Sequence, residues 1–123
     1  MLSETFKNEI TIEQMADIHP SEYVLADIRD GISHEYGSIP SSLSMPSILR
    51  DADEGTLSRE KSYILYCMKG FLSFDAAEEL RANGYDAVSL KGGYSEWLLS
   101  SYKDSDGQMQ AQVEKSLQKK FRR

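Results

Sequence analysis

The sequence predicts an α/β fold, a three-layer sandwich in which helices flank a mostly parallel central sheet. Short apolar runs that are typical of buried strands alternate with segments whose apolar residues recur at helical spacing. Glycine and proline residues separate these segments. The chain has 123 residues, of which 40% are hydrophobic, so it can bury a core within one domain without disulfide or metal staples.

The first elements are a short edge strand, predicted at residues 8–12, and a helix over residues 12–18. Thr11 is suited to cap this helix, because Gln14 stands three residues later and can complete a reciprocal capping box. Pro20 ends the helix, since proline lacks an amide donor.

A buried strand is predicted at residues 23–28, where an apolar run is bounded by polar residues. One helical turn is expected at residues 33–36, and a short strand at residues 43–45. Residues 51–61 are polar, and we predict a connection without regular structure there.

The strongest strand signal is the unbroken aromatic and aliphatic run at residues 62–66. Helical spacing predicts a helix over residues 74–81, which an Asn-Gly pair ends. Residues 86–90 form a further predicted strand. A Gly-Gly pair then turns the chain into a helix over residues 94–99.

The net charge of −6 conceals two segments of opposite sign. Residues 104–123 hold five basic and three acidic residues, so they carry +2 and the 103 residues before them carry −8. This balance argues against binding nucleic acid by charge alone. We predict a domain over residues 1–103 and a basic helical extension or linker over residues 104–123. Apolar residues recur there at every fourth position, and this stripe either packs on the domain or needs a partner surface: Met109, Val113, Leu117 and Phe121.

Composition excludes several classes of protein. No apolar run approaches the roughly 20 residues that span a bilayer, and the first residues lack the pattern of a signal peptide. We therefore expect a cytoplasmic protein without a membrane partner. The single cysteine excludes an internal disulfide and a thiolate-rich zinc site, and two isolated histidines are too few for another metal site. No metal and no cofactor are therefore expected. His19 is predicted to be exposed. His34 is predicted to lie at the surface, and the alternative is a position beside Cys67 as its charge partner.

The single cysteine, Cys67, directly follows the strongest predicted strand and precedes a loop that leads into a helix. Ligands of parallel sheets bind at the carboxyl ends of strands, and a helix N-terminus offers unpaired amides that favour anions. The same amides favour a thiolate, so we expect Cys67 to be nucleophilic. Gly70 lets the loop turn its amides inward. Ser73 is predicted first as a helix cap and second as an active-site hydroxyl. The alternative for Cys67 is a small buried hydrophobic residue.

Several motifs, in the same order along the chain, resemble those of the rhodanese-like sulfurtransferase family. The resemblance covers about residues 8–102. It is carried by Leu25-Ala26-Asp27-Ile28-Arg29, which resembles the family's Asp-x-Arg strand end, by residues 35–40, which resemble its Gly-His-Ile-Pro loop, and by residues 63–73, 83–85 and 90–97.

The resemblance implies that Cys67 accepts a sulfane sulfur, from thiosulfate or a protein persulfide, and becomes a persulfide. Asp27 and Arg29 would support the site from the neighbouring strand. The loop residues that would bind the substrate are Met68, Lys69, Gly70, Phe71, Leu72 and Ser73. Because the chain has no second cysteine, the sulfur must leave to an external thiol, a small nucleophile or a partner protein.

The chain departs from the family pattern at two positions. Leu72 stands where many members have an arginine, and Ser38 stands where the family has a histidine. The first departure removes a strong anion-binding donor, so weak thiosulfate activity is expected. The apolar side chains of Met68, Phe71 and Leu72 fit a docked protein or persulfide donor better than a small dianion.

Two other functions share parts of this pattern. A dual-specificity phosphatase needs an arginine six residues after its cysteine, where this chain has Ser73. A non-catalytic docking or regulatory module stays open, because the missing arginine favours it while the retained cysteine opposes it. Residues 113–123 resemble the lead-in to tRNA 2-thiocytidine-type thiolation enzymes. That likeness implies a fused or associated tRNA-thiolation domain, and a solvated basic helix is the alternative.

Overall fold

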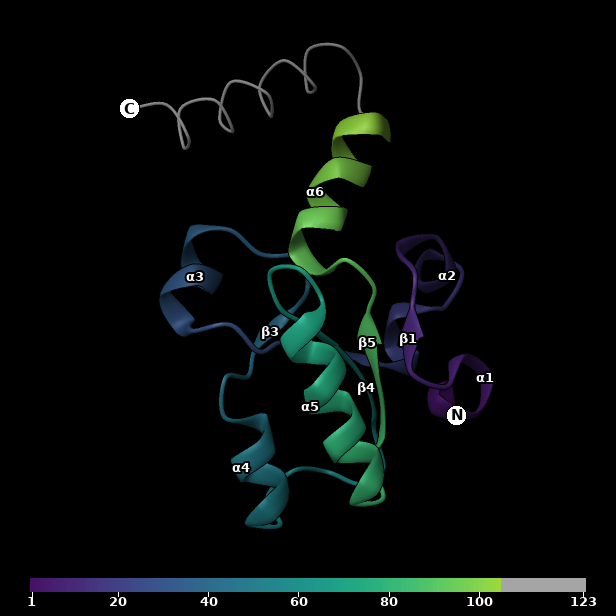
Figure 1. The fold of residues 1–123 in the computed structure, drawn as a ribbon, viewed down its shortest axis with the longest axis vertical. Coiled ribbons are helices and arrows are strands. Elements are labelled where there is room, and N and C mark those ends of the chain that lie inside the picture. Colours follow the sequence, from purple (N-terminus) through teal and green to yellow (C-terminus); the bar gives the residue numbers. More distant parts are fainter. Residues whose placement is uncertain (105–123) are drawn as a thin grey trace.

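The computed structural model describes residues 1–104, which form an α/β sandwich around one sheet (Figure 1). The five strands are parallel and lie in the order β1-β5-β4-β2-β3. They are β1 (Glu9–Ile10), β2 (Val24–Asp27), β3 (Leu43–Ser44), β4 (Ser62–Tyr66) and β5 (Asp86–Leu90). The helices are α1 (Leu2–Phe6), α2 (Ile12–Ala16), α3 (Gly31–Tyr36), α4 (Ile48–Asp53), α5 (Phe71–Ala82) and α6 (Gly93–Asp104), with a 3₁₀ turn at Pro20–Glu22.

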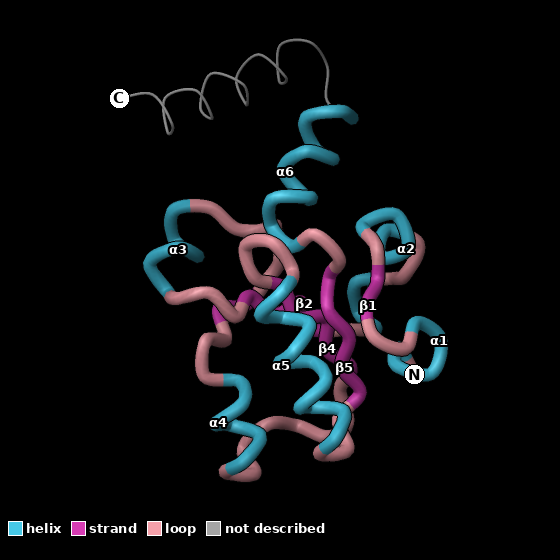
Figure 2. Tube along the Cα trace, viewed as in Figure 1, coloured by secondary structure: helices cyan, strands magenta, loops and turns pink. Residues whose placement is uncertain are grey.

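Two hydrophobic cores lie on opposite faces of the sheet, because successive side chains of a strand point to opposite sides. In β4, Tyr63 and Leu65 pack with α4 and α5, whereas Ile64 and Tyr66 pack on the other face with α1, α2 and α6. Figure 2 shows α4 and α5 side by side against the sheet, with α1 and α2 near its β1 edge. The predicted three-layer sandwich is confirmed, and every strand pair is parallel.

All five predicted strands form, with ends within two residues of those expected. The capping box before α2 also forms: the amide of Gln14 donates to the Thr11 hydroxyl at 3.1 Å, and the amide of Thr11 donates to Gln14 Oε1 at 2.9 Å. Short-range signals of this kind need no tertiary information, which is why they are read correctly from the sequence.

Two helices were not predicted. The start of the stretch 51–61, expected to be irregular, belongs to α4, whose buried residues Ile48 and Ala52 lie one helical turn apart. Ile48 lies before the polar stretch. The sequence of that stretch alone therefore does not show the apolar face of α4. The α1 helix is fixed by a distant residue: the carboxylate of Asp86 accepts from the amides of Leu2 at 2.9 Å and Ser3 at 2.7 Å.

The two longest helices extend beyond their predicted ends. The α5 helix begins at Phe71 rather than residue 74, and α6 runs from Gly93 to Asp104 rather than over residues 94–99. The predicted basic extension, beyond its first residue, and its apolar stripe lie outside the described residues. Across residues 1–104, no helix combines the length and apolar character that a bilayer crossing requires.

The all-parallel arrangement gathers the carboxyl ends of the strands at one edge of the sheet. Asp27 at the end of β2 is the Cα partner of Tyr66 at the end of β4, and the amide of Ile28 donates to the Tyr66 carbonyl at 3.0 Å. The segments that follow β2 and β4 therefore leave the sheet next to each other. This edge carries Cys67.

Candidate active site around Cys67

Cys67 lies between β4 and α5, at the bottom of a loop that closes on its sulfur. Only 4% of the residue is exposed. The amides of Gly70 and Ser73 donate to Cys67 Sγ at 3.2 and 3.3 Å. Gly70 is the residue before α5 and has a φ of 92°, a left-handed conformation that glycine adopts without strain. The loop thus aims backbone donors at the sulfur, as predicted for an anion or a thiolate.

A chain of two buried hydroxyls lies beneath the sulfur. The Cys67 thiol donates to Ser73 Oγ at 3.4 Å, and Ser73 Oγ lies 2.7 Å from Ser89 Oγ on β5. Ser73 and Ser89 are both fully buried. When Cys67 is a thiolate, the Ser73 hydroxyl can turn and donate to it, while Ser89 takes up the other bond of Ser73.

The hydrogen bonds around the sulfur outweigh its burial. Burial alone raises the pKa of the Cys67 thiol, but hydrogen bonds from the Ser73 hydroxyl and from the amides of Ser73, Gly70 and Lys69 lower it. The resulting pKa lies below the ordinary value. A lowered pKa increases the fraction of nucleophilic thiolate at neutral pH.

The turn after β5 supports the loop from the side. The amides of Tyr94 and Ser95, in the first turn of α6, donate to the carbonyls of Cys67 and Met68, each at 2.9 Å. Gly93 has a φ of 58°, and a Cβ there would collide with the Cys67 carbonyl oxygen and lie 2.9 Å from the Gly70 nitrogen. The Gly-Gly pair, predicted only as a turn, therefore also makes room for the cysteine loop.

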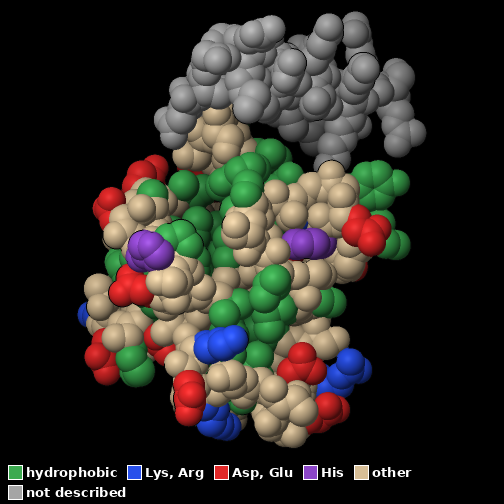
Figure 3. All heavy atoms as spheres, turned by 180° about the vertical axis from the view of Figure 1, so that it is seen from behind, with side chains coloured by type: hydrophobic (Ala, Val, Ile, Leu, Met, Phe, Trp, Pro, Cys, Tyr) green, Lys and Arg blue, Asp and Glu red, His purple; other side chains and the backbone are tan. Residues whose placement is uncertain are grey.

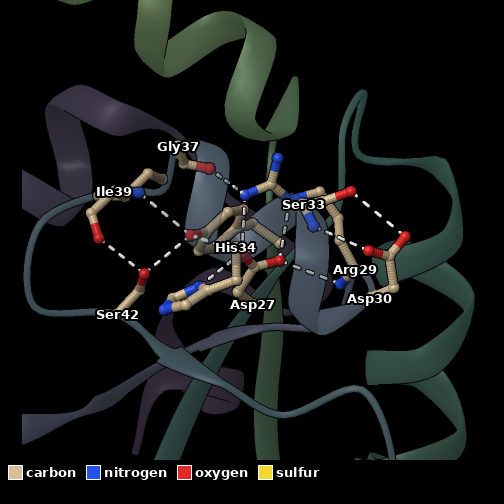
Figure 4. Close-up of polar contacts among 9 residues, drawn as sticks. Asp27, Arg29, Asp30, Ser33, His34, Gly37, Ile39 and Ser42 are labelled. Carbon is tan, nitrogen blue, oxygen red and sulfur yellow. Dashed lines mark hydrogen bonds and ion pairs between the residues drawn. The ribbon is translucent and has the colours of Figure 1, made fainter.

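Asp27 and Arg29 form a buried ion pair at the carboxyl end of β2 (Figure 4). Arg29 Nε donates to Asp27 Oδ1 at 3.0 Å and Nη2 donates to Oδ2 at 2.7 Å, while the Tyr66 hydroxyl donates to Oδ2 at 3.1 Å. Burial raises the pKa of Asp27, but the hydrogen bonds from Arg29 and His34 outweigh it and hold the pKa below its usual value. Asp27 is thus a buried carboxylate.

Arg29 links this ion pair to the helix that supports the cysteine loop. Its guanidinium carbon lies 4.4 Å from the centre of the Tyr94 ring, which is the geometry of a cation–π contact. Its Nη2 also donates to the Gly37 carbonyl at 2.7 Å, as Figure 4 shows. Because the Tyr94 amide holds the Cys67 carbonyl, the ion pair lies two contacts away from the cysteine.

Three site positions differ from the expectation. His34 was predicted at the surface, but its Nδ1 lies 2.9 Å from Asp27 Oδ2 and its side chain is only 22% exposed. The turn at residues 31–36 is a helix that folds His34 back over the strand end.

Ser73 does not cap α5, since Gly70 takes that place and Ser73 is the third helical residue. Ser89 was missed, although a serine inside a buried apolar strand is itself a signal.

The side chains of the loop point away from its amide-lined interior. Phe71 is 75% exposed, Leu72 73% and Met68 39%, and Lys69 is exposed as well. The site is therefore built from backbone donors and two serine hydroxyls, while the loop side chains face outward. His19 is exposed, as predicted. Residues 1–104 contain no cluster of three histidine, cysteine or carboxylate side chains that could hold a metal ion.

A lone cysteine in an amide-lined loop at the carboxyl edge of a parallel sheet defines a class of domains built for thiol chemistry. The rhodanese-like domain family matches residues 11–100, and the chain belongs to this family. The family is associated with sulfurtransferase activity in general.

Three curated relatives differ in how much of their own length the match covers. The tRNA sulfurtransferase of Desulfurococcus amylolyticus is 30% identical over 81 residues, which cover 66% of this chain and 16% of the relative. The tRNA sulfurtransferase of Pyrobaculum aerophilum is 36% identical over 77 residues, 61% of this chain and 16% of the relative. The chain thus matches only a small part of these proteins. A sulfurtransferase of Allochromatium vinosum is 29% identical over 93 residues, 73% of this chain and 87% of the relative.

Solved structures share the fold. A rhodanese-related protein from Thermoplasma volcanium superposes with a TM-score of 0.67 at 29% identity, covering 76% of this chain and 92% of that one. The human single-domain sulfurtransferase superposes with a TM-score of 0.63, covering 74% of this chain and 95% of that one. Its identity is 20%, so this likeness concerns the fold alone.

Proposed function

We propose that the protein carries sulfane sulfur as a persulfide on Cys67 and passes it to an external thiol, nucleophile or partner protein. The observation that supports this most directly is the environment of Cys67 Sγ, which accepts from the amides of Gly70 and Ser73 and has a lowered pKa. These donors stabilise a sulfur anion at neutral pH, and a persulfide at the same position would meet the same donors.

The first step loads the cysteine. The Cys67 thiolate attacks the sulfane sulfur of the donor, the bond between that sulfur and its carrier breaks, and the carrier leaves with the bonding electron pair. With thiosulfate the leaving group is sulfite, and with a protein persulfide it is the carrier's cysteine thiolate. The donor is reduced by the transfer, so no other oxidant takes part.

The second step needs an external acceptor. Within this sequence there is no second cysteine that could attack the persulfide and release the sulfur as an internal disulfide. An external thiolate takes the outer sulfur, and Cys67 returns to its starting state. The free thiol at the centre of this cycle suits a reducing compartment such as the cytoplasm, which is where we propose that the protein acts.

A protein persulfide fits the site better than thiosulfate as the donor. Leu72 occupies the position of the family's anion-binding arginine, and its side chain is 73% exposed and uncharged. The arginine at the neighbouring strand end, Arg29, is engaged by Asp27 and stacked on Tyr94. A small dianion therefore gains little beyond the backbone amides, whereas a protein donor also contacts the apolar side chains outside the loop.

The wider context is part of the proposal. We propose a sulfur-carrying domain over residues 1–103 and an extension over residues 104–123 that leads to, or contacts, a tRNA-thiolation partner. The names of the two longer curated relatives support this direction. The extension is basic, with a net charge of +2.

Intact-mass measurement tests the proposal. The full chain is incubated with thiosulfate or, separately, with a cysteine desulfurase loaded with persulfide. We expect an adduct of about 32 Da, one sulfur atom, that dithiothreitol removes and that a Cys67→Ser variant does not form. The persulfide donor should load the protein faster than thiosulfate. Absence of the adduct with both donors would instead favour the non-catalytic docking module.

A further inference from the structure

The segments that follow β2 and β4 at the carboxyl edge of the sheet expose large apolar side chains, on α3 and on the cysteine loop. We call this surface the docking face and define it by Ile32 and Tyr36 on α3 together with Met68, Phe71 and Leu72 of the loop and of the start of α5. Their exposed fractions range from 39% for Met68 to 90% for Tyr36. Methionine and aromatic residues are enriched in protein interfaces, and clustered exposure of this kind marks interaction sites.

The two parts of the docking face follow adjacent strands, β2 and β4, at the same edge of the sheet. Asp27 pairs with Tyr66, so α3 and the cysteine loop leave adjacent strands at the same edge. Figures 1 and 2 show α3 and the loop before α5 on this edge of the molecule. Seen from behind, hydrophobic side chains stand out beside acidic ones where α3 lies (Figure 3).

A pocket of about 670 Å³ adjoins the docking face on the side of β1. Phe71 belongs to both, because its ring is exposed and also lines the pocket. The charged lining consists of three carboxylates and two ammonium groups: Glu9, Glu13, Glu96, Lys69 and Lys91. Within residues 1–104 none of these five side chains forms an ion pair within 4.0 Å.

The charge of this edge is predominantly negative. On the other side of the loop, α3 adds Glu35, and Asp30 precedes it; both residues are exposed. The docking face and its pocket thus combine apolar side chains with three carboxylates and two lysines, and Asp30 and Glu35 add two carboxylates at the α3 end. A complementary surface presents apolar and basic side chains together.

We propose that the docking face binds a sulfur-acceptor protein through a protruding segment whose cysteine is flanked by apolar and basic residues. This inference rests on the proposed function of Cys67. Because Cys67 is 4% exposed, the acceptor sulfur must enter the loop, which a thin segment can do and a flat surface cannot. The apolar flanks lie on the docking face, and a lysine or arginine reaches the carboxylates of the adjoining pocket.

Other occupants fit the chemistry less well. Residues 105–123 are basic and partly apolar, but they contain no cysteine and cannot accept the sulfur. A second copy of the chain would bring only its own Cys67, which is enclosed by its own loop. An external protein with an accessible cysteine meets both requirements.

The transfer conserves atoms and electrons. The acceptor's cysteine thiolate attacks the outer sulfur of the Cys67 persulfide, and the bond between that sulfur and Cys67 Sγ breaks. The outer sulfur first takes up a proton from water. Cys67 then leaves with the bonding electron pair as a thiolate, while the outer sulfur carries that proton and becomes the acceptor's persulfide. The lowered pKa of Cys67 makes it a good leaving group.

Synthetic peptides test the inference on the full chain. The first peptide has a central cysteine flanked by leucines and lysines, the second has glutamates for the lysines, and the third has serines for the leucines. After Cys67 is loaded and the loading verified by mass, transfer of sulfur to each peptide is timed. Each rate is divided by that peptide's rate with a small aromatic disulfide, which corrects for differences in thiol reactivity. We expect the first peptide to react at least about tenfold faster than the other two, a difference of about 1.4 kcal/mol.

Variants locate the contact. Ile32→Ser combined with Tyr36→Ser should slow transfer to the first peptide and leave transfer to 2-mercaptoethanol unchanged. Glu13→Lys should remove the preference for lysine over glutamate. Glu60→Lys is the matched control, because Glu60 is an exposed carboxylate that precedes β4 at the opposite edge of the sheet, and it should change nothing.

Several results would overturn the inference. Equal rates for the three peptides would exclude a selective docking face. Faster transfer to 2-mercaptoethanol in the Ile32→Ser, Tyr36→Ser variant would show that the chain's own tail covers the face, and a dependence of that rate on protein concentration would indicate a second copy. If Cys67 does not load at all, the proposed function fails. Binding of a fluorescent peptide with serine in place of cysteine then tests the face separately, and equal anisotropy for the three flanking sequences refutes it.

Discussion

The hydroxyl of Ser89 lies 2.7 Å from the hydroxyl of Ser73, which contacts the sulfur of Cys67 at 3.4 Å. Both serines are fully buried, so water does not compete for these bonds. Ser89 comes from β5 and Ser73 from α5, and their contact joins the strand to the first turn of the helix. Ser89 therefore acts on the cysteine through Ser73, as a positioning residue.

Replacing Ser89 by alanine should make Cys67 less reactive. Without its partner, the Ser73 hydroxyl is no longer held in place to donate to the thiolate. Loss of one neutral hydrogen bond is worth about 1 kcal/mol, which corresponds to an alkylation rate about fivefold lower at neutral pH. The rate of reaction with iodoacetamide, measured as a function of pH, should show a raised thiol pKa. The rate at high pH, where the thiol is fully ionised, should be nearly unchanged.

A Ser73→Ala variant provides the comparison, since it removes the direct contact. The thiol pKa measured from its alkylation profile should rise further than that of Ser89→Ala. If Ser89→Ala leaves the profile where it is in the wild type, the hydroxyl pair does not influence the thiol.

A methyl group at Gly93 should disrupt the cysteine loop. The added Cβ would meet the Cys67 carbonyl oxygen and lie 2.9 Å from the Gly70 nitrogen, and the backbone at φ 58° disfavours alanine in any case. We expect Gly93→Ala to lower the free energy of unfolding by more than about 2 kcal/mol and to abolish sulfur loading. Urea unfolding and intact-mass measurement check the two effects.

Gly31→Ala is the matched control for this substitution. Gly31 begins α3, and a Cβ there meets no atom within 4 Å. Gly31→Ala should leave the free energy of unfolding and the sulfur loading close to those of the wild type. Equal effects of the two variants would mean that the close approach of Gly93 to the loop is not what holds the site.

Local patterns predicted the sheet and the position of Cys67. The apolar run before Cys67 predicts a strand, and the glycine three residues after Cys67 marks the loop that leads into a helix. Contacts between distant segments escaped prediction. The carboxylate that holds α1 belongs to Asp86, 84 residues away from Leu2, and no periodicity near either residue reports it.

The electrostatic support of the site was only partly readable from the sequence. The family resemblance implies that Asp27 and Arg29 support the site from the neighbouring strand, but their ion pair is seen only in the structure. A surface position was predicted for His34 from the sequence. This histidine reaches Asp27 only once α3 turns the chain back, and the buried Tyr66 completes the contacts from another strand.

Removing the carboxylate of Asp27 should destabilise the fold strongly at neutral pH. Asp27→Asn leaves the buried guanidinium of Arg29 without its charged partner, and such losses typically cost about 3–5 kcal/mol. Chemical unfolding at pH 7 measures the difference from the wild type. A loss below about 1 kcal/mol would show that the ion pair is not needed for stability.

The destabilisation by Asp27→Asn should depend on pH in one direction. The pKa of Asp27 is lower in the folded protein than its usual value, so its stabilising contribution is complete above the unfolded pKa of about 3.9. The contribution is lost as the pH falls through the folded pKa. The gap between wild type and variant should therefore be constant at neutral pH and shrink below about pH 4. The lowered pKa of Asp86 affects both proteins alike and cancels in the difference.

Restoring a cation at position 72 should improve the use of thiosulfate. Leu72 lies in the first turn of α5 and is 73% exposed, so an arginine fits there without disturbing the core. Its guanidinium can bind the dianion that the backbone amides alone hold weakly. We expect Leu72→Arg to lower the KM for thiosulfate by about tenfold, equivalent to about 1.4 kcal/mol of binding. Leu99→Arg on α6, outside the loop, controls for the added charge and should leave that KM unchanged. An unchanged KM in Leu72→Arg would mean that the preference against thiosulfate has another origin than the missing arginine.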